Sequence, residues 1–584
     1  MSLRRITPRF VRGLLLLVGL AAAAAHAQSP AVAPAAPRRG EAVAIPAEAL
    51  PARADTALEK GLELESRGRW GDAVAHYERA MRQNPEDRRL ERRFGIARLH
   101  SSLERRYADA SYLDTLGQLD TAAALDLHAE LLSKIQAHYV VAPPWTKLTR
   151  DGAEAMLIAA RDPGFLSQHG IRPSAESVGR LRQELIDRLS AAGQVRNARE
   201  ALRLASDFSR LGEAELGAPA SAWTLEFVAA AAGGLDGYSA FLTPGQLRDV
   251  YSQIEGNFVG LGVELKADGG ALLIVRVIPG SPAEKAGIAP GDRITAVDGQ
   301  QTATLTTDEA ASLLTGDEGS YAYVTVASPV EGDAAAHLTA KPTPQGAILG
   351  ESRTIRVRRE HVEVPSVEDA RLTDAAAGVA YMRLPVFQKS TARDVESALW
   401  DLRRQGMRTL VIDLRGNPGG LLTAAVELAD KFVDQGAIVS TRGRSEGEDF
   451  DYRAHRAGTW RVPLVVLIDG DSASASEIFA AAIRDNRRGA IVGDRSFGKG
   501  SVQGIFPMTR SGAGVRLTTA KFYSPLGREI DKVGVSPDVL VSAEADVVAT
   551  GYRGAEPADD AALVRAIQVA RQQAKLALQQ PAVR

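Results

Sequence analysis

The sequence contains no cysteine, and this absence excludes several chemistries at once. Without a thiol there is no disulfide, no thiolate metal ligand and no cysteine nucleophile. The nine histidines are scattered, with neither an HExxH pattern nor another paired spacing, so we expect no metal site and no cofactor. A formal net charge of −2 lacks the basic excess that nucleic-acid binding needs. Thiol catalysis is therefore excluded, and a zinc site and bulk nucleic-acid binding are disfavoured.

The composition, the length and the N-terminal segment predict a large exported protein. A hydrophobic content of 45% and a charged content of 24% are those of ordinary globular proteins, and 584 residues predict several domains. Residues 1–27 have the features of a secretory signal: arginines, an apolar run over 14–25 and an Ala-His-Ala cleavage site. That run is shorter than the roughly 20 residues of a membrane span. We expect a mature chain without a stable membrane span, in a periplasm or outside the cell.

Residues 28–52 are rich in alanine and proline and predict a linker, whereas residues 53–245 predict a helical domain. Within it, the offsets of one tetratricopeptide-like (TPR-like) unit are occupied by Gly61, Ala73, Tyr77, Ala80 and Pro85. An ordinary helical hairpin is an equally good interpretation. The sharper hypothesis is that this region docks a protein partner.

A strand that breaks into a helix is the central feature of the second half. Residues 464–468 form a continuous apolar run, as in a strand buried on both faces. A turn of small residues follows over 469–476, and then apolar residues recur at helical spacing. Such a turn places a serine beside the free N–H groups of the helix, where an oxyanion is stabilised. The alternative is a serine that only caps the helix.

A second turn lies downstream, at residues 496–503. It holds Lys499 between Gly498 and Gly500. Since glycines cost chain entropy, a lysine between two of them indicates more than a solvated charge.

Together these turns resemble the carboxy-terminal processing (tail-specific) proteases, which are serine peptidases with a Ser/Lys dyad. Residues 472–478 (SASASEI) match the family's serine turn, and residues 497–500 (FGKG) match its lysine turn. The resemblance implies that Ser474 is the nucleophile, that Lys499 is its base and that Gln503 orients the lysine amine. One departure is Asp471, where the family often has glycine.

The resemblance extends to a glycine loop, DLRGNPGG, at residues 413–420, which follows the apolar run at 409–414. In the family this loop forms one wall of the oxyanion hole. It implies that the N–H groups of Gly419 and Ala475 bind the oxyanion, with Gly420 open as the alternative to Gly419. The segment 527–539 matches the family's closing segment.

Upstream, residues 236–244 resemble the sequence that precedes the PDZ domain of the same proteases. Residues 246–360 look like that PDZ domain, with an insertion at 331–352. Its carboxylate-binding loop is then formed by Gly260, Leu261, Gly262 and Val263. Glycines let successive N–H groups converge on a terminal carboxylate. We expect the peptide groove between strand 263–265 and a helix near 307–314.

These assignments predict a multidomain α+β protein. A helical region with a TPR-like unit precedes a β-rich PDZ domain and an α/β (ββα-type) protease core over 361–545, and a polar tail over 546–584 is helical from 560 to 579. The predicted function is an exported serine endopeptidase whose PDZ domain captures substrate C-termini. The alternative is a catalytically inactive PDZ/TPR-like scaffold that binds peptides. An acyl-CoA-handling enzyme with a related core is disfavoured by the PDZ domain and the lysine.

Overall fold

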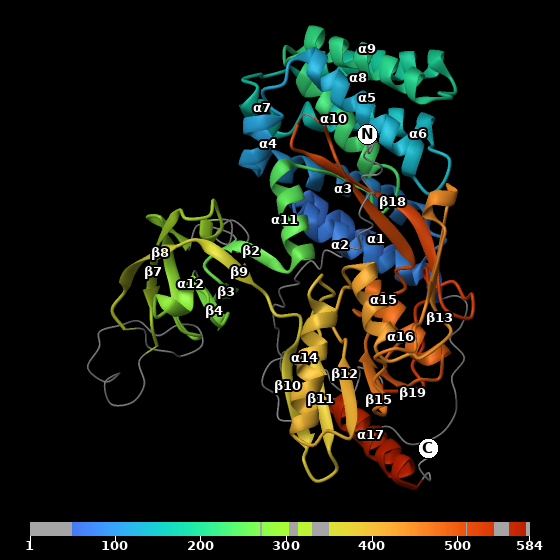
Figure 1. The fold of residues 1–584 in the computed structure, drawn as a ribbon. Helices are drawn as coiled ribbons and strands as arrows, with labels where there is room; N and C mark the ends of the chain where they lie inside the picture. Colours follow the sequence, from blue (N-terminus) through green and yellow to red (C-terminus); the bar gives the residue numbers. More distant parts are fainter. Residues whose placement is uncertain are drawn as a thin grey trace, which may run out of the picture. The chain divides into compact units, whose positions relative to one another are not determined.

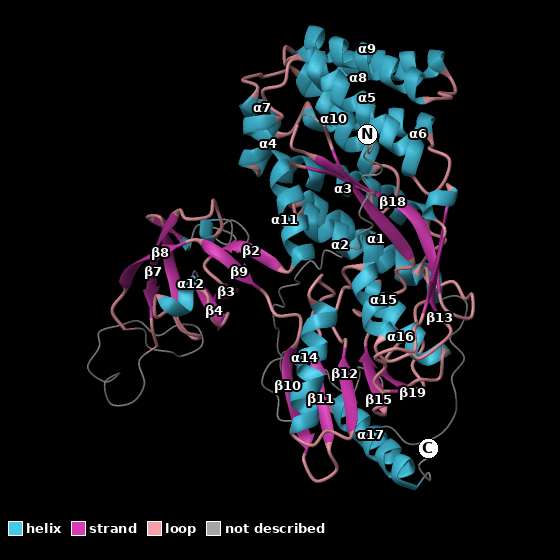
Figure 2. Cartoon of the chain, viewed as in Figure 1, coloured by secondary structure: helices cyan, strands magenta, loops and turns pink. Residues whose placement is uncertain are grey.

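The computed structural model describes residues 49–268, 271–302, 313–329, 350–509, 511–541 and 560–579. The described residues fall into two compact units. The first joins the chain up to Arg248 with 369–387 and the chain from Ser397 onward, and the second joins 249–368 with 388–396. The predicted signal (1–27), most of the insertion (331–352) and most of the helix near 307–314 lie outside the described residues. Figures 1 and 2 show the elements of both units.

The N-terminal part of the first unit is helical, as predicted. Capping residues such as Asp120, Ser174 and Asn197 each accept a hydrogen bond from a free N–H of the first turn. Helix α10 is buried on nearly every face, with Trp223 at the centre of the hydrophobic core. The helices are α1 (Ala49–Ser66), α2 (Trp70–Gln83), α3 (Arg88–Ala108), α4 (Ala110–Thr115), α5 (Thr121–His138), α6 (Trp145–Ala159), α7 (Pro163–Gln168), α8 (Ala175–Ala192), α9 (Ala198–Leu216) and α10 (Ala220–Gly233).

Helices α1 and α2 form a close hairpin. A Cβ atom on Gly61 would lie 2.1 Å from the ring of Tyr77, so only glycine allows the ring to pack there. Ala73 and Ala80 are buried in the same small cluster. The helical hairpin is confirmed, and the TPR-like assignment stays a prediction. Helix α1 begins at Ala49, inside the predicted linker (28–52), because a proline is tolerated in the first turn of a helix.

The core of the first unit contains two sheets. The larger has the order β10-β11-β12-β15-β16-β19, and the strands from β11 to β19 pair in parallel. The strands are β10 (Glu368–Asp374), β11 (Val379–Arg383), β12 (Thr409–Asp413), β15 (Leu464–Ile468), β16 (Ala490–Gly493) and β19 (Val539–Leu540). Strands β12 and β15 are buried along their whole length, which is what their uninterrupted apolar sequences require. The associated helices are α14 (Thr391–Arg404), α15 (Leu422–Asp430) and α16 (Ala475–Asp485).

The second sheet of this unit is antiparallel and joins the helical region to the core. Its order is β1-β18-β13-β14, with β17 also paired to β18. The strands are β1 (Ala240–Leu242), β13 (Ala437–Gly443), β14 (Phe450–Arg453), β17 (Ser501–Pro507) and β18 (Gly514–Tyr523), and a 3-10 turn covers Glu446–Glu448. Strand β1 lies in the segment 236–244 that was predicted to precede the PDZ domain. Its pairing with β18 brings that segment to the core.

The C-terminal helix packs against the larger sheet, beyond the predicted end of the core at residue 545. Helix α17 (Ala561–Gln579) matches the predicted helix, but it is no separate polar tail: it packs on β12, β15 and β16 (Figure 1). Leu563 and Ala566 share a hydrophobic cluster with Val411 and Val465. The reason is a narrow apolar face, in which alanines recur every fourth residue at Ala562, Ala566, Ala570 and Ala574.

The second unit contains a β-rich domain around its own core. Its sheet has the order β3-β4-β5-β7-β8, with β6 paired to β5, and β2 pairs separately with β9. The elements are α11 (Pro244–Glu255), β2 (Asn257–Gly260), β3 (Val263–Asp268), β4 (Ala271–Val277), α12 (Pro282–Lys285), β5 (Arg293–Val297), β6 (Gln300–Gln301), β7 (Tyr321–Ala327), β8 (Arg353–Arg358) and β9 (Glu360–Glu363). Leu261, Ile274 and Val324 are fully buried in this core. Across the described ranges, no helix is long and apolar enough to cross a membrane.

The packing of α17 predicts that Leu563→Ala destabilises the core. Leu563 is 5% exposed, and truncation of a buried leucine costs about 2–5 kcal/mol. Leu576→Ala in the same helix is the matched control, because Leu576 is 56% exposed and its truncation should cost less than about 0.5 kcal/mol. Urea denaturation followed by circular dichroism measures both. Equal midpoints for the two variants would contradict the packing of α17 on the sheet.

Candidate active site

The candidate site residues lie in the turns that follow three neighbouring parallel strands. The glycine loop (413–420) follows β12, the serine turn (469–476) follows β15, and the lysine turn (496–503) follows β16. Because the carboxyl ends of parallel strands meet at one edge of the sheet, the three turns lie at the same edge. The sheet order therefore brings together motifs that are far apart in the sequence.

Ser474 lies at the sharp corner between β15 and α16. Its φ of 62° and ψ of −112° are sparsely populated for a residue with a side chain and cost about 1–3 kcal/mol. The side chain is fully buried, and its Oγ has no hydrogen-bond partner among the described residues. Ser474 and Glu477 also have the arrangement of a capping box, so Ser474 caps α16 as well as occupying this strained corner. Asp471 does not need the conformational freedom of the family's glycine, because its φ is not positive.

Glu477, in the first turn of α16, joins the serine turn to the lysine turn. Its Oε2 accepts hydrogen bonds from the N–H of Ser474 (2.7 Å) and the N–H of Lys499 (2.9 Å). Its Oε1 accepts from the N–H of Gly498 (2.7 Å) and the Oγ of Ser496 (2.5 Å). Burial raises the pKa of Glu477, and these four donors act against that rise. One buried carboxylate thus fixes both turns.

Lys499 is 5% exposed, and burial lowers its pKa from 10.5 to about 7, with a further lowering from the charge of Arg516. Its Nζ lies 5.0 Å from the ring centre of Tyr238. The flanking glycines are required by a close backbone approach, since a Cβ atom on Gly500 would lie 2.2 Å from the backbone nitrogen of Asp531. A buried amine that is half neutral near pH 7 can accept a proton.

Gln503 lies on β17, at the end of the lysine turn. Its Nε2 donates to the Oγ (2.9 Å) and the carbonyl oxygen (3.2 Å) of Ser501. Its Oε1 is buried without a hydrogen-bond partner in the described part of the chain. The carbonyl end of the side chain is therefore available to accept a hydrogen bond from another group.

The glycine loop approaches the serine turn closely. A Cβ atom on Gly419 would lie 2.7 Å from the Cβ of Ser474 and 3.0 Å from the N of Ala475, so a side chain there would fill the space beside the serine. The N–H of Gly419 donates to Oδ1 of Asn417 (2.8 Å). Ala475 is the first residue of α16, so its N–H is one of those that have no acceptor within the helix. This corner is suited to an oxyanion.

Asn417 and Arg415 hold the glycine loop in place. The carbonyl oxygen of Asn417 accepts from the N–H of Ala473 and the Oγ of Ser476, both at 3.0 Å. Arg415 is paired with Asp413 in β12 (2.7 Å) and with Asp560 at the start of α17 (2.8 Å). The predicted tail therefore also supports the loop beside Ser474.

In the second unit, the predicted carboxylate-binding loop precedes β3. The carbonyl oxygen of Leu261 accepts from the N–H of Ala283, and that of Gly262 accepts from the N–H of Ile278, both at 2.9 Å. Gly262 has a φ of 83°, and a Cβ atom there would lie 2.3 Å from the Cβ of Ser281. The loop is held tightly between Gly260, at the end of β2, and Val263, at the start of β3.

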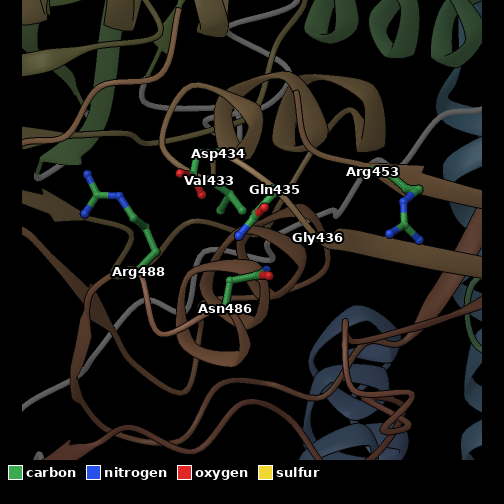
Figure 3. Close-up of a pocket in the computed structure, with 7 residues that line it drawn as sticks. All are labelled: Val433, Asp434, Gln435, Gly436, Arg453, Asn486 and Arg488. Atoms are coloured by element: carbon green, nitrogen blue, oxygen red, sulfur yellow. The ribbon is translucent and has the colours of Figure 1, made fainter. Parts of the chain in front are cut away.

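A cavity of about 510 Å³ lies apart from these turns, near the end of α16 (Figure 3). It is lined by Val433, Asp434, Gln435, Gly436, Arg453, Asn486 and Arg488. The guanidinium of Arg488 donates to the carbonyl oxygens of Phe432, Trp460 and Val462, so its hydrogen bonds hold the main chain in place. Figure 3 shows Arg453 and Arg488 on opposite sides of Asn486. This cavity contains none of the predicted site residues, and the described residues include no cluster suited to a metal.

Sequence reasoning missed three residues that shape the site: Glu477, Asn417 and Tyr238. The first carried a signal, because Ser474 and Glu477 have the Ser-x-x-Glu spacing of a capping box. Asn417 and Tyr238 act through contacts between segments distant in sequence, which no local pattern reveals.

Comparison with known proteins adds two domain assignments. Residues 378–541 match the model of peptidase family S41, and residues 273–328 match a PDZ domain. The first match contains all three turns, and the second falls within the β-rich domain of the second unit.

Several curated proteins are similar over about half of the chain. The chain is 35% identical over 312 residues to the carboxy-terminal-processing protease of Bartonella bacilliformis, covering 53% of this chain and 67% of that protein. It is 36% identical over 311 residues to the carboxyl-terminal-processing protease of Picosynechococcus sp., covering 53% and 70%. A solved structure of a photosystem II D1 C-terminal processing protease is 26% identical, with a TM-score of 0.36 and coverage of 72% and 94%. The chain belongs to peptidase family S41, among the carboxy-terminal-processing serine proteases that carry a PDZ domain.

Proposed function

We propose that the protein is an exported serine endopeptidase of the C-terminal processing type that uses Ser474 as nucleophile and Lys499 as base. The observation that carries this proposal is the shared oxygen of Glu477, which binds the N–H groups of both residues within 2.9 Å. It holds a strained serine with an unpartnered hydroxyl next to the turn of a buried lysine. A serine that only caps a helix would not need the strained corner, and a solvated lysine would not need to be buried.

In the first half of the reaction, neutral Lys499 takes the Oγ proton of Ser474 while Oγ bonds to the carbonyl carbon of the scissile peptide. The negative charge on the carbonyl oxygen is stabilised by the N–H of Ala475 at the positive end of α16. Gly419 supplies the second donor if its N–H exchanges the Asn417 oxygen for the substrate oxygen, and Gly420 is the alternative donor.

The carbon–nitrogen bond then breaks, and protonated Lys499 gives its proton to the leaving amine. This leaves an ester on Ser474. In the second half, Lys499 takes a proton from water, the water oxygen attacks the ester carbon, and the serine leaves with that proton. We assign Gln503 the role of orienting the amine through its carbonyl oxygen, because a neutral amide adds no charge that would keep the lysine protonated.

The PDZ domain supports a preference for free substrate C-termini. A carboxylate would bind the N–H groups of the loop formed by Gly260, Leu261, Gly262 and Val263, and the chain would add to the edge of β3. The helical N-terminal region, with its TPR-like hairpin, is the candidate for docking a protein partner. Export rests on residues 1–27, which read as a secretory signal.

The first test is cleavage of an unfolded protein of defined C-terminus, with fragments identified by mass spectrometry. Wild-type protein should cut it, and Ser474→Ala should not, while circular dichroism shows both to be folded. A substrate with an amidated C-terminus should be cut more slowly. Cleavage by Ser474→Ala would remove the serine assignment, whereas an inactive wild type would favour the scaffold alternative.

The second test concerns the lysine and pH. Since Lys499 must be neutral and its pKa is about 7, kcat/KM should rise with pH to a midpoint near 7 and fall about tenfold per unit below it. Lys499→Arg keeps the charge but cannot give a neutral base, so activity should fall about 10²–10⁴-fold at every pH up to 9. Lys521→Arg on β18 is the control, because Lys521 is 42% exposed. An unchanged rate in Lys499→Arg would exclude the lysine base.

The third test addresses the carboxylate that joins the turns. In Glu477→Gln one oxygen becomes an NH₂ group that faces N–H donors, and buried groups left without partners cost about 1–3 kcal/mol each. We expect a lower midpoint of urea denaturation and at least a tenfold loss of kcat. Glu427→Gln on the exposed face of α15 should change neither quantity. Full activity in Glu477→Gln would show that the two turns do not depend on this residue.

A further inference from the structure

Arg516 lies on β18, which pairs with the strand that follows the lysine turn, and its set of contacts is unusual. Strand pairing places it between Ala240 of β1 and Ile505 of β17. Its Nε donates to the carbonyl oxygen of Tyr238 (2.9 Å), whose ring faces the Nζ of Lys499. Its Nη1 is buried and has no hydrogen-bond partner among the described residues. Tyr238 therefore connects the two cationic side chains, with its main chain holding one and its ring facing the other.

An arginine that served packing alone would pair its buried donors, because each unpaired donor costs about 1–3 kcal/mol. The segment around Tyr238 is itself fixed by Arg98 of α3, which donates to the carbonyl oxygens of Asp236 (2.5 Å) and Ser239 (3.1 Å). Arg516 is thus held at the main chain of Tyr238, with part of its guanidinium buried. A fixed positive charge at such a place acts on its neighbours with little screening.

We propose that Arg516 is a positioning residue for the reaction: its guanidinium, fixed beside Lys499 through Tyr238, opposes protonation of the Lys499 amine and keeps it ready as a base. This inference rests on the proposed role of Lys499. On this proposal, Arg516, which lies outside the three turns, adds to the effect of burial in keeping the Lys499 amine unprotonated.

Other charged groups around Lys499 act in the opposite direction to Arg516. Glu477 of α16, Glu78 of α2 and Asp236 before β1 all raise the pKa of Lys499. Against them stand burial, which is the largest effect, and the charge of Arg516. The pKa of Arg516 is lowered to about 10, by burial and then by Arg98, so its guanidinium is still charged at neutral pH. Arg105 also lowers it, and Asp236 raises it.

The test is to remove this charge and keep the contact with Tyr238. Arg516→Gln retains an N–H donor, and Arg516→Met serves as the second variant if the first does not fold. A nearby positive charge lowers the pKa of a lysine by about one unit or more. Removal of the Arg516 charge should therefore raise the pKa of Lys499 from about 7 to about 8. At pH 7 the neutral fraction, and with it kcat/KM, should fall about fivefold, and at pH 9 the activity should recover almost fully.

Two controls fix the sign of the effect. Glu78→Gln removes a negative charge, so it should move the acid limb of the profile to lower pH. Arg442→Gln on β13, a third strand paired with β18, removes a different arginine and should leave the profile unchanged. A purely structural role of Arg516 would lower the rate at all pH values alike, and that result would overturn the proposal.

A measurement without turnover separates this inference from the proposed function. Lysine labelled with ¹³C at Cε gives the pKa of Lys499 directly by NMR in Ser474→Ala protein, with Lys499→Arg to assign the signal. A rise on Arg516→Gln supports the proposal, and an unchanged pKa overturns it. If Lys499→Arg is instead fully active, the lysine base is wrong, even where the pKa of Lys499 responds to Arg516.

Discussion

The active corner of this protease depends on one buried carboxylate that accepts four hydrogen bonds. Glu477 belongs to α16, yet three of its four donors come from the turn that follows β16, and the fourth is the N–H of Ser474. The main chain also links the two turns, since the N–H of Phe497 donates to the carbonyl oxygen of Ser472 (3.0 Å), but Glu477 is the group that joins Ser474 to Lys499. Because hydrogen bonds to a charged group in a dry interior are strong and directional, the carboxylate fixes a geometry that strand pairing leaves loose.

The parallel sheet supplies the coarse alignment that Glu477 refines. Strands β12, β15 and β16 are neighbours, so each of the three motifs begins at the same edge. Asn417 then ties the glycine loop to the serine turn, and Arg415 ties the same loop to Asp560 at the start of α17. The antiparallel sheet also contributes to the site. The pairing of β1 with β18 places the neighbouring residue Tyr238 so that its ring faces Lys499. Residues from 236 to 560 thus converge on one corner.

Much of this could be predicted from the sequence where the signal is local. The apolar runs of β12 and β15, the corner at Ser474 and the glycines around Lys499 all have a short-range physical cause, and each was found. The partners of those residues have no such cause. The segment of Tyr238 reaches the site through the pairing of Ala240 with Arg516, and Asp560 reaches Arg415 across 145 positions because α17 packs on the sheet. Helix α17 was predicted as a helix but not as part of the core, because alanines that pack closely give only a weak apolar pattern.

The same carboxylate creates an electrostatic conflict that the rest of the site has to resolve. A negative charge close to Lys499 favours the ammonium form, whereas the proposed reaction needs the amine. Glu477 accepts hydrogen bonds from both turns, so the effect that opposes its charge on the lysine comes from other groups. Burial provides most of it, and a guanidinium held rigidly at Tyr238 provides a further part that does not depend on excluding every water molecule. An arginine suits this task better than a second lysine would, because it keeps its charge at neutral pH even when burial lowers its pKa to about 10.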